Sequence, residues 1–183
     1  MTRAALAQRL RLPLGFLLAA LYLLFARPRP RTLGIGLVLA LGGVLVRAWA
    51  SGHIAKNQRL AITGPYAHTR NPLYLGSFLI ACGFAIAARW WLLAVVVAFF
   101  VLIYFPTMRR EREKIRSSFP EEYREYERQV PAFLPRLVPW RPAVRARAAR
   151  FSPSLYMRHG EWKVALGYLG AMAWLLVRAW RLG

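Results

Sequence analysis

The chain alternates between long apolar blocks and short, strongly basic connections. Apolar residues dominate five stretches, at residues 12–26, 32–50, 72–88, 90–105 and, less cleanly, 162–180. A helix needs about 17–25 mainly apolar residues to cross a bilayer, so several of these blocks are short for a perpendicular crossing. Only Arg89 separates the third block from the fourth. So short a connection predicts that these two blocks form a tight antiparallel helical hairpin.

Composition supports a membrane protein. Hydrophobic residues make up 57% of the 183 positions, and the mean hydropathy of +0.32 is well above that of ordinary soluble proteins. We expect an all-α, polytopic integral membrane protein that forms one domain over residues 1–183, with about five transmembrane helices. Because Ala26-Arg27-Pro28 is a poor cleavage site and further apolar blocks follow, we interpret residues 12–26 as a retained helix rather than a signal peptide.

The basic residues lie between the apolar blocks. The 27 lysines and arginines outnumber the seven glutamates and give a net charge of +20. Five crossings put the N-terminus, the 51–71 loop and the 106–158 stretch on one side, which the positive-inside rule makes cytoplasmic. The basic residues left on the other side are Arg27, Arg29, Arg31, Arg89, Arg178 and Arg181. The charge is therefore explained by orientation and by contact with anionic lipids, and no nucleic-acid-binding motif is present.

The residues that most often bind metals are scarce. Cys82 is the one cysteine, aspartate is absent, and the three histidines do not form a zinc-site spacing with it. We therefore expect no metal. His53, His68 and His159 are interpreted as polar loop residues because none has an obvious nucleophile partner. The lone Gly34-Ile35-Gly36 is better explained by close helix packing than by ligand binding.

A first motif occupies residues 64–76, where Gly-Pro-Tyr is followed by Arg-Asn-Pro-Leu-Tyr-Leu-Gly. It predicts a turn and then a helix, with Asn71 as the N-cap and Pro72 at the first helical position. Capping alone explains this pattern. A helix N-terminus also attracts carboxylates and phosphates, and Tyr66, Arg70 and Tyr74 add hydroxyls, rings and a charge. Both interpretations, capping and ligand binding, stay open at this point.

A second motif lies in the polar stretch 108–126, which predicts a helix that continues into the cytoplasm. At 100° per residue Met108, Ile115 and Phe119 form its inward stripe, and Glu111 and Arg112 flank that stripe. A glutamate beside a buried stripe is a functional-site candidate, although an ion pair with a neighbouring arginine explains it equally well. An exposed, ion-paired face without chemistry is expected for Glu121, Glu122, Glu125 and Glu127.

Four prolines, Pro131, Pro135, Pro139 and Pro142, break regular structure after the second motif. Residues 136–160 form a basic cytoplasmic segment. Within it, residues 141–150 are either a helix lying on the headgroups or a solvated connection. Residues 161–183 form a C-terminal helix that either spans the membrane or lies in its interface.

The ordered combination of these motifs resembles the isoprenylcysteine carboxyl methyltransferase family. The shared features are Gly-Pro-Tyr, Arg-Asn-Pro-Leu-Tyr-Leu-Gly, a helical hairpin, Glu111 eight residues before Phe119, Tyr-x-x-Tyr and the Val-Pro…Leu-Pro ending. That family is similar in turn to membrane phospholipid methyltransferases. The resemblance covers a core at residues 46–135, and it implies S-adenosylmethionine as cofactor, held in a pocket at the cytoplasmic face.

The resemblance also implies roles for individual residues. Glu111 matches the glutamate expected near the ammonium group of the cofactor. The expected cofactor-binding residues are Gln58, Arg59, Leu60, Ala61, Tyr66, Arg70, Asn71, Pro72, Leu73, Tyr74 and Glu111. The chain departs from the family pattern at Asn71, where a histidine is usual, at Arg112, where a second glutamate is usual, and at Pro120, where a glycine is usual. Where this chain has Thr107, the family has an arginine that recognises the substrate. The departures therefore affect the expected identity of the acceptor more than that of the cofactor.

We expect a methyltransferase that acts on an amphiphilic, lipid-like acceptor, most similar to carboxyl O-methyltransferases. Arg109 and Arg110, expected with Glu111 in the catalytic set, could hold an acceptor carboxylate or phosphate. Phospholipid N-methylation and small-thiol S-methylation are alternatives, as is a non-enzymatic scaffold or lipid-binding protein. The bias toward arginine and alanine indicates a GC-rich bacterial genome, so we expect a bacterial inner membrane. The distribution of basic residues places the active site on the cytoplasmic side.

Overall fold

The computed structural model describes residues 3–54, 60–141 and 150–182, and every regular element within these ranges is helical. Each of the five predicted apolar blocks is largely helical, although the first extends one residue past α1 and the fourth begins two residues before α4. The helices are α1 (Arg3–Phe25), α2 (Pro30–Ser51), the short 3-10 helix η1 (Gly64–Ala67), α3 (Pro72–Ala88), α4 (Leu92–Phe99), the π-helical η2 (Phe100–Tyr104), α5 (Phe105–Ser118), α6 (Pro120–Gln129), α7 (Pro153–Arg158) and α8 (Trp162–Leu182).

One continuous helix combines the fourth apolar block with much of the polar stretch that follows it. α4, η2 and α5 run without a break over Leu92–Ser118. The π-helical segment ends two residues before Pro106, which has no N–H to donate to the carbonyl of Leu102. A proline inside a helix removes that bond and crowds the same carbonyl, so the backbone before it widens.

The expected helix over 108–126 is wrong in part. It is interrupted at Phe119, where the backbone leaves the helical region, and α6 restarts at Pro120. A residue that precedes a proline is disfavoured in the helical conformation, which accounts for the break. Met108 is buried as expected, but the Ile115 side chain is 39% exposed. The inward stripe therefore ends before Ile115.

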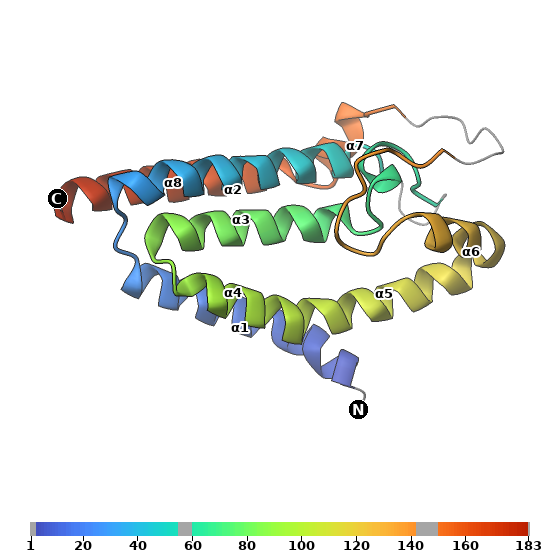
Figure 1. Ribbon diagram of the computed structural model, residues 1–183, viewed down its shortest axis with the longest axis horizontal. Helices are drawn as coiled ribbons and strands as arrows, with labels where there is room; N and C mark the ends of the chain where they lie inside the picture. The colour runs from blue at the N-terminus through green and yellow to red at the C-terminus, as the bar shows by residue number, and fades with distance from the viewer. Residues whose placement is uncertain (1–2, 55–59, 142–149, 183) are drawn as a thin grey trace.

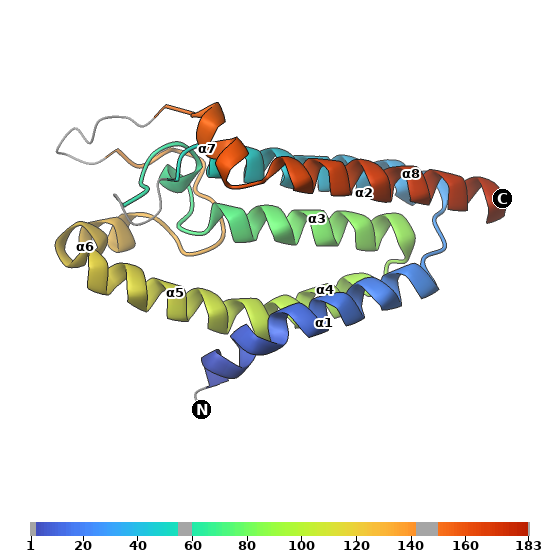
Figure 2. The same ribbon diagram turned by 180° about the vertical axis from the view of Figure 1, so that it is seen from behind.

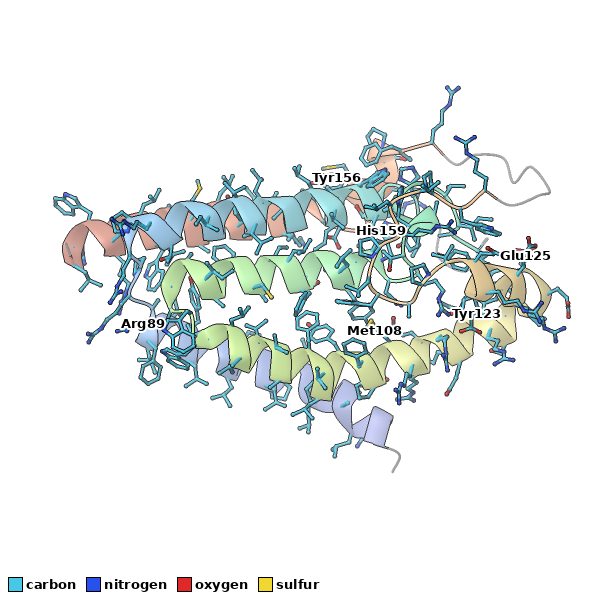
Figure 3. All side chains as sticks on the ribbon, in the orientation of Figure 1. Arg89, Met108, Tyr123, Glu125, Tyr156 and His159 are labelled. Atoms are coloured by element: carbon cyan, nitrogen blue, oxygen red, sulfur yellow. The ribbon has the colours of Figure 1, made fainter. Side chains whose placement is uncertain are left out.

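The long helices lie side by side in layers. α3 lies between a layer formed by α2 and α8 and a second layer formed by α1 and the α4–α5 rod (Figures 1 and 2). α3 and α4 form the predicted hairpin, joined at residues 89–91. Arg89 marks that end of the molecule, whereas Tyr123 and His159 lie at the opposite end (Figure 3). Both sequence motifs are therefore carried to the end opposite Arg89.

Glycines bring α2 and α3 into backbone contact at two levels. A Cβ added to Gly36 would lie 2.3 Å from the carbonyl oxygen of Gly83, and one added to Gly43 would lie 2.5 Å from that of Gly76. The contacts are reciprocal, because a Cβ on Gly83 or on Gly76 would meet the carbonyl of its partner at 2.5 and 2.7 Å. Small residues allow such close approach in membrane helix pairs. The packing interpretation is confirmed for Gly36 but not for Gly34, which has open space around it.

α8 runs antiparallel to α2 and is bonded to the rest of the fold along its length. At its start, Glu161 forms an ion pair with Arg47 of α2. Midway, the Tyr168 hydroxyl donates to the Leu37 carbonyl at 3.1 Å. Near its end, Arg178 Nε donates to the Ala26 carbonyl at 2.6 Å. These three contacts fix the direction of α8 relative to α2.

Among the described residues, two helices are long and apolar enough to cross a membrane, Pro30–Ser51 and Leu92–Ser118. Leu12–Phe25 and Pro72–Ala88 are apolar but shorter. Large apolar side chains also face outward, such as Phe16 at 74% and Val38 at 71% exposure. Outward apolar side chains over long helices are consistent with membrane association. The number of about five crossings stays a prediction.

Gly42 and Gly43 provide a matched test of the α2–α3 contact. We expect Gly43→Ala to destabilise the protein by roughly 1–3 kcal/mol, because its methyl group meets the backbone of α3. The neighbouring Gly42 has nothing within 4 Å of an added Cβ, so Gly42→Ala should be neutral or stabilising. Thermal unfolding of the purified protein in detergent measures both. Equal effects of the two substitutions would contradict the contact.

Candidate functional site

The two sequence motifs meet through a direct side-chain contact. The Tyr74 hydroxyl, in the first turns of α3, donates to Glu111 Oε1 of α5 at 2.8 Å. Both residues are half-buried. The hydrogen bond orients one carboxylate oxygen of Glu111 toward α3. Glu111 therefore belongs to the same site as the 64–76 motif, and its partner is a tyrosine rather than the arginine that the ion-pair alternative required.

The segment that follows α6, residues 131–136, holds the first motif through hydrogen bonds to its own backbone, and we refer to it as the clamp. Arg70 N–H donates to the Pro131 carbonyl at 2.9 Å, and Arg136 N–H donates to the His68 carbonyl at 2.9 Å. The Thr69 hydroxyl donates to the Phe133 carbonyl, also at 2.9 Å. The prolines of this segment prevent a helix there, so its backbone groups are available to the 67–71 turn.

Asn71 lies at the N-cap position of α3, but its side chain does not cap the helix. Its Nδ2 donates instead to the Ala132 carbonyl at 2.8 Å. The capping hypothesis is therefore wrong for the Asn71 side chain, because the clamp competes for the same amide. Pro72 does occupy the first helical turn and is buried. Because no side chain caps α3 and Pro72 has no N–H, the Leu73 N–H stays available to a ligand.

Tyrosines of α6 pack against the turn of the first motif. The Tyr126 hydroxyl donates to the Tyr66 carbonyl at 2.7 Å. Tyr123, Tyr126 and Val130 form a buried cluster, against which Leu60 packs. Burial raises the pKa of Tyr126, and the neighbouring Tyr66 and Tyr123 add to that rise. The Tyr126 hydroxyl is therefore a neutral donor at physiological pH, as its bond to a carbonyl requires.

The Arg70 guanidinium contacts α6 through its Nη1. Its Nη1 lies 2.5 Å from Glu127 Oε1 and 3.1 Å from the Tyr123 hydroxyl. Glu127 also pairs with Arg112 at 3.5 Å. Glu127 was expected on an exposed, ion-paired face; the ion pairing is confirmed, but the exposure is wrong, since its side chain is only 26% exposed. Arg70 positions the turn against α6.

A second ion pair lies on the other side of the first motif. Arg47 Nε and Nη2 donate to the two carboxylate oxygens of Glu161 at 3.0 and 2.7 Å. Arg47 Nη1 also donates to the Leu73 carbonyl at 3.2 Å and to the Ser77 hydroxyl. The arginine thus joins α2, α8 and the first turns of α3. Sequence reasoning missed it, although a single arginine inside an apolar block is itself a signal.

The Tyr66 hydroxyl is buried without a hydrogen-bond partner in the described part of the chain. The residue as a whole is 6% exposed. Burial raises its pKa; the Glu161 carboxylate adds to the rise and the Arg47 guanidinium opposes it. A buried hydroxyl with no partner costs free energy, so this donor is a candidate for contact with a ligand or an ordered water.

The other predicted residues are placed apart from the Tyr74–Glu111 pair or take structural roles. Arg109 is exposed, and Arg110 bonds Gln8 of α1 at 2.7 Å. Ala61 is half-buried beside Leu60, and Leu73 contributes its carbonyl to Arg47. Gln58 and Arg59 lie outside the described residues, as does most of the 141–150 stretch.

Two further expectations concern residues near the site. Thr107, which replaces the family's substrate-reading arginine, is 1% exposed and donates its hydroxyl to the Ile103 carbonyl. The histidines each contact a backbone carbonyl through Nδ1, from Trp49 for His53, Arg136 for His68 and Ser51 for His159. Across the described ranges no three metal-ligating side chains gather in one place.

Comparison with known proteins assigns a family to this arrangement. Residues 32–122 match the family model described as phospholipid methyltransferase. This segment is a phospholipid methyltransferase domain. It contains the first motif, Arg47 and Glu111, whereas Glu127 and α8 lie beyond it. The resemblance to membrane methyltransferases inferred from the motifs is confirmed at the level of the family.

Two curated proteins are similar to part of the chain. One, the cobalt-zinc-cadmium resistance protein CzcN of Cupriavidus metallidurans, is 39% identical over 110 residues, 58% of this chain and 49% of that protein. The other, the nickel-cobalt-cadmium resistance protein NccN of Alcaligenes xylosoxydans xylosoxydans, is 35% identical over 106 residues, 56% of this chain and 48% of that protein. The matches span about half the length of these relatives. No solved structure matches the chain.

Glu125 and Glu127 allow a matched test of how α6 is attached to the phospholipid methyltransferase domain. We expect Glu127→Gln to weaken the docking of α6 by roughly 1–3 kcal/mol, because Arg70 loses a charge-assisted partner. The exposed Glu125 is the control, and Glu125→Gln should change stability by less than about 0.5 kcal/mol. Hydrogen–deuterium exchange of the α6 amides measures both. Unchanged protection in Glu127→Gln would contradict the proposed attachment.

Proposed function

We propose that the protein is an S-adenosylmethionine-dependent membrane methyltransferase acting on an amphiphilic, lipid-like acceptor. The observation that carries the proposal is the Tyr74–Glu111 hydrogen bond, which joins the two motifs within a phospholipid methyltransferase domain. A carboxylate held by a tyrosine at the start of α3 is suited to bind the ammonium group of a water-soluble donor.

The residues present fit the cofactor. The buried Tyr66 hydroxyl lacks a partner in the described ranges and can donate to a polar group of the ligand. The uncapped N-terminus of α3 offers the Leu73 N–H for a carboxylate, since Pro72 has no N–H and the Asn71 N–H donates to the Thr69 hydroxyl. Glu111 offers a negative charge for an ammonium. The segment at Leu60–Ala61 leads directly to these groups, and with Gln58 and Arg59 it completes the proposed binding set.

The reaction needs a site that a water-soluble methyl donor and a lipid-like acceptor can both reach. When bound, S-adenosylmethionine supplies a methyl group from positively charged sulfur, and the electron pair of the broken S–C bond stays on that sulfur. An anionic acceptor is neutralised as the new bond forms, so a dry site favours its methylation. For such an acceptor the chain needs no general base, and its residues bind, align and exclude water.

An amine acceptor would place one further demand on the chain. It must lose a proton before it attacks, and Glu111 is the carboxylate beside the site that could accept that proton. Tyr74 orients the Glu111 carboxylate in either case. Carboxyl O-methylation is the activity most similar to the family that the motifs resemble; phospholipid N-methylation and small-thiol S-methylation are the alternatives. Arg110, with Arg109 beside it, would hold an anionic acceptor group or lipid headgroups near α1.

The names of the two relatives add a biological setting to the proposal. Both are described as resistance proteins for cobalt, cadmium and a third metal. The similarity to these two proteins favours an acceptor in the membrane whose methylation contributes to metal resistance.

The proposed location is a bacterial inner membrane, with the site at the cytoplasmic end. α8 carries Trp162 and Trp180 near its two ends, and 18 residues of helix separate them by about 27 Å. That length is close to a hydrocarbon core of about 30 Å, and tryptophans prefer the two interfaces. The bonds from α8 to Leu37 of α2 and to Ala26, in the connection that precedes α2, support a helix that crosses alongside α2.

Neighbouring glutamates on α5 allow a controlled test of cofactor binding. We expect Glu111→Gln to weaken binding of S-adenosylmethionine roughly 10- to 100-fold, the loss of one charge-assisted hydrogen bond. Glu113 is exposed on another face of α5, so Glu113→Gln should leave the affinity within about twofold. Isothermal titration calorimetry on detergent-purified protein gives both values. Equal affinity in wild type and Glu111→Gln would remove Glu111 from the site.

A methyl-transfer assay separates the enzyme from a non-enzymatic scaffold. With labelled S-adenosylmethionine, we expect the protein to label one of three acceptor classes, namely prenylated cysteine carboxylates, aminolipids or small thiols. Labelling of one class identifies the acceptor. A folded sample that neither binds the cofactor nor labels any acceptor would favour the alternative, a scaffold or lipid-binding protein whose motifs cap helices and contact headgroups.

A further inference from the structure

Six aromatic side chains, one of them Tyr74 of the Tyr74–Glu111 pair, contact one another, and the proposed function has used only Tyr74. They come from three segments that are distant in the sequence: two from α3, three from the π-helical segment and the start of α5, and one from the segment that follows α6. We refer to them as the aromatic cluster, which consists of Tyr74, Phe78, Phe100, Tyr104, Phe105 and Phe133.

The rings form a chain of pairwise contacts that passes through Tyr104. The Tyr74 and Tyr104 rings meet nearly at right angles, with centroids 5.4 Å apart. Phe100 stacks on Tyr104 at 4.4 Å, and Phe78 meets Phe100 at 4.9 Å. Phe133 extends the cluster to the clamp that holds the first motif, with its centroid 5.6 Å from that of Phe78. Tyr104 is therefore joined both to α3 and to the membrane-facing rings.

The π-helical segment creates part of this arrangement. π-helical turns are rare and are frequently found at functional sites. Here the turn covers Phe100–Tyr104, and its two end residues are the rings that stack, 12° from parallel. Thr107 reinforces the same turn by donating its buried hydroxyl to the Ile103 carbonyl at 2.7 Å. The departure from α-helical geometry thus falls on the residues that present Tyr104 toward α3.

Tyr104 and Glu111 occupy one face of a continuous helix. They are seven residues apart, about two turns, and Tyr74 contacts both of them. Beyond Glu111, toward α6, the neighbouring side chains are charged, as in the Arg112–Glu127 pair. Beyond Tyr104, toward the membrane, they are aromatic. The Tyr74–Tyr104 ring pair therefore lies where the surroundings change from charged to apolar.

A methyl transfer between a water-soluble donor and a lipid-like acceptor has to take place at such a boundary. The reacting sulfur of the donor is a cation, and ring faces and carboxylates both attract cations in a site shielded from water. We infer that the Tyr74 and Tyr104 rings bind the positively charged sulfur of the methyl donor, while the Glu111 carboxylate binds its ammonium group. This inference rests on the proposed function and assigns a specific task to Tyr104: preference for an onium cation over a neutral ligand.

The charged donor and its neutral product provide the test. S-adenosylmethionine and S-adenosylhomocysteine differ by one methyl group and by the charge on sulfur. The dissociation constants of both are measured for the full chain in detergent, for wild type, Tyr104→Leu and Tyr104→Phe. Phe105→Leu is a further control, because Phe105 contacts Phe133 and is 38% exposed.

We expect Tyr104→Leu to weaken binding of S-adenosylmethionine by about 3- to 30-fold, the range of a cation–ring contact. Binding of S-adenosylhomocysteine should stay within about twofold. Tyr104→Phe and Phe105→Leu should keep both affinities close to wild type. Should Tyr104→Leu fail to fold, phenylalanines of increasing fluorination at position 104 keep the shape and weaken the negative ring face. Affinity for the charged donor should then fall stepwise, and affinity for the neutral product should not.

The outcomes that overturn the inference are distinct from those that overturn the proposed function. Parallel loss of both ligands in Tyr104→Leu, or no loss of either, would show that the ring is structural, and the methyltransferase proposal would stand. If folded wild-type protein binds neither adenosyl compound, the proposed function fails and the inference fails with it.

Discussion

The close approach of α2 and α3 is the constraint on which the site depends. Two glycine pairs, Gly36 with Gly83 and Gly43 with Gly76, let the backbones touch where any side chain would separate them. The same approach passes the Arg47 side chain beside Gly76, so that Arg47 reaches Leu73 and Ser77 in the first turns of α3. A wider spacing would withdraw this guanidinium and release the start of α3, which carries Tyr74.

The site is assembled from two sides of that helix start. On one side Arg47 and Glu161 attach α8, which lies beyond the matched family segment, to the first motif. On the other side Arg70 and Glu127 attach α6. Each guanidinium is paired with a carboxylate because an isolated charge in so shielded a place is costly. The first motif is thereby fixed between two ion pairs, which leaves Tyr66 and Tyr74 as the polar groups that face the site.

Several features could be predicted because they depend on local sequence. The apolar blocks, the α3–α4 hairpin and the helix start at Pro72 follow from composition, a short connection and the fixed backbone angle of proline. Glu111 could be singled out because a glutamate beside a buried stripe needs a partner. The identity of that partner, Tyr74, could not be predicted, since 37 residues of chain separate the two and spacing carries no information about their contact.

The sequence by itself therefore determined the helices, their apolar character and the family. Tertiary structure alone decided which polar groups meet: Asn71 contacts Ala132 instead of capping α3, Glu127 pairs with Arg70 instead of facing solvent, and Arg47 finds Glu161. The physical reason is range. Helix formation and hydrophobicity depend on neighbours within a few turns, whereas a polar side chain selects its partner among all the segments that packing brings within about 3 Å of it.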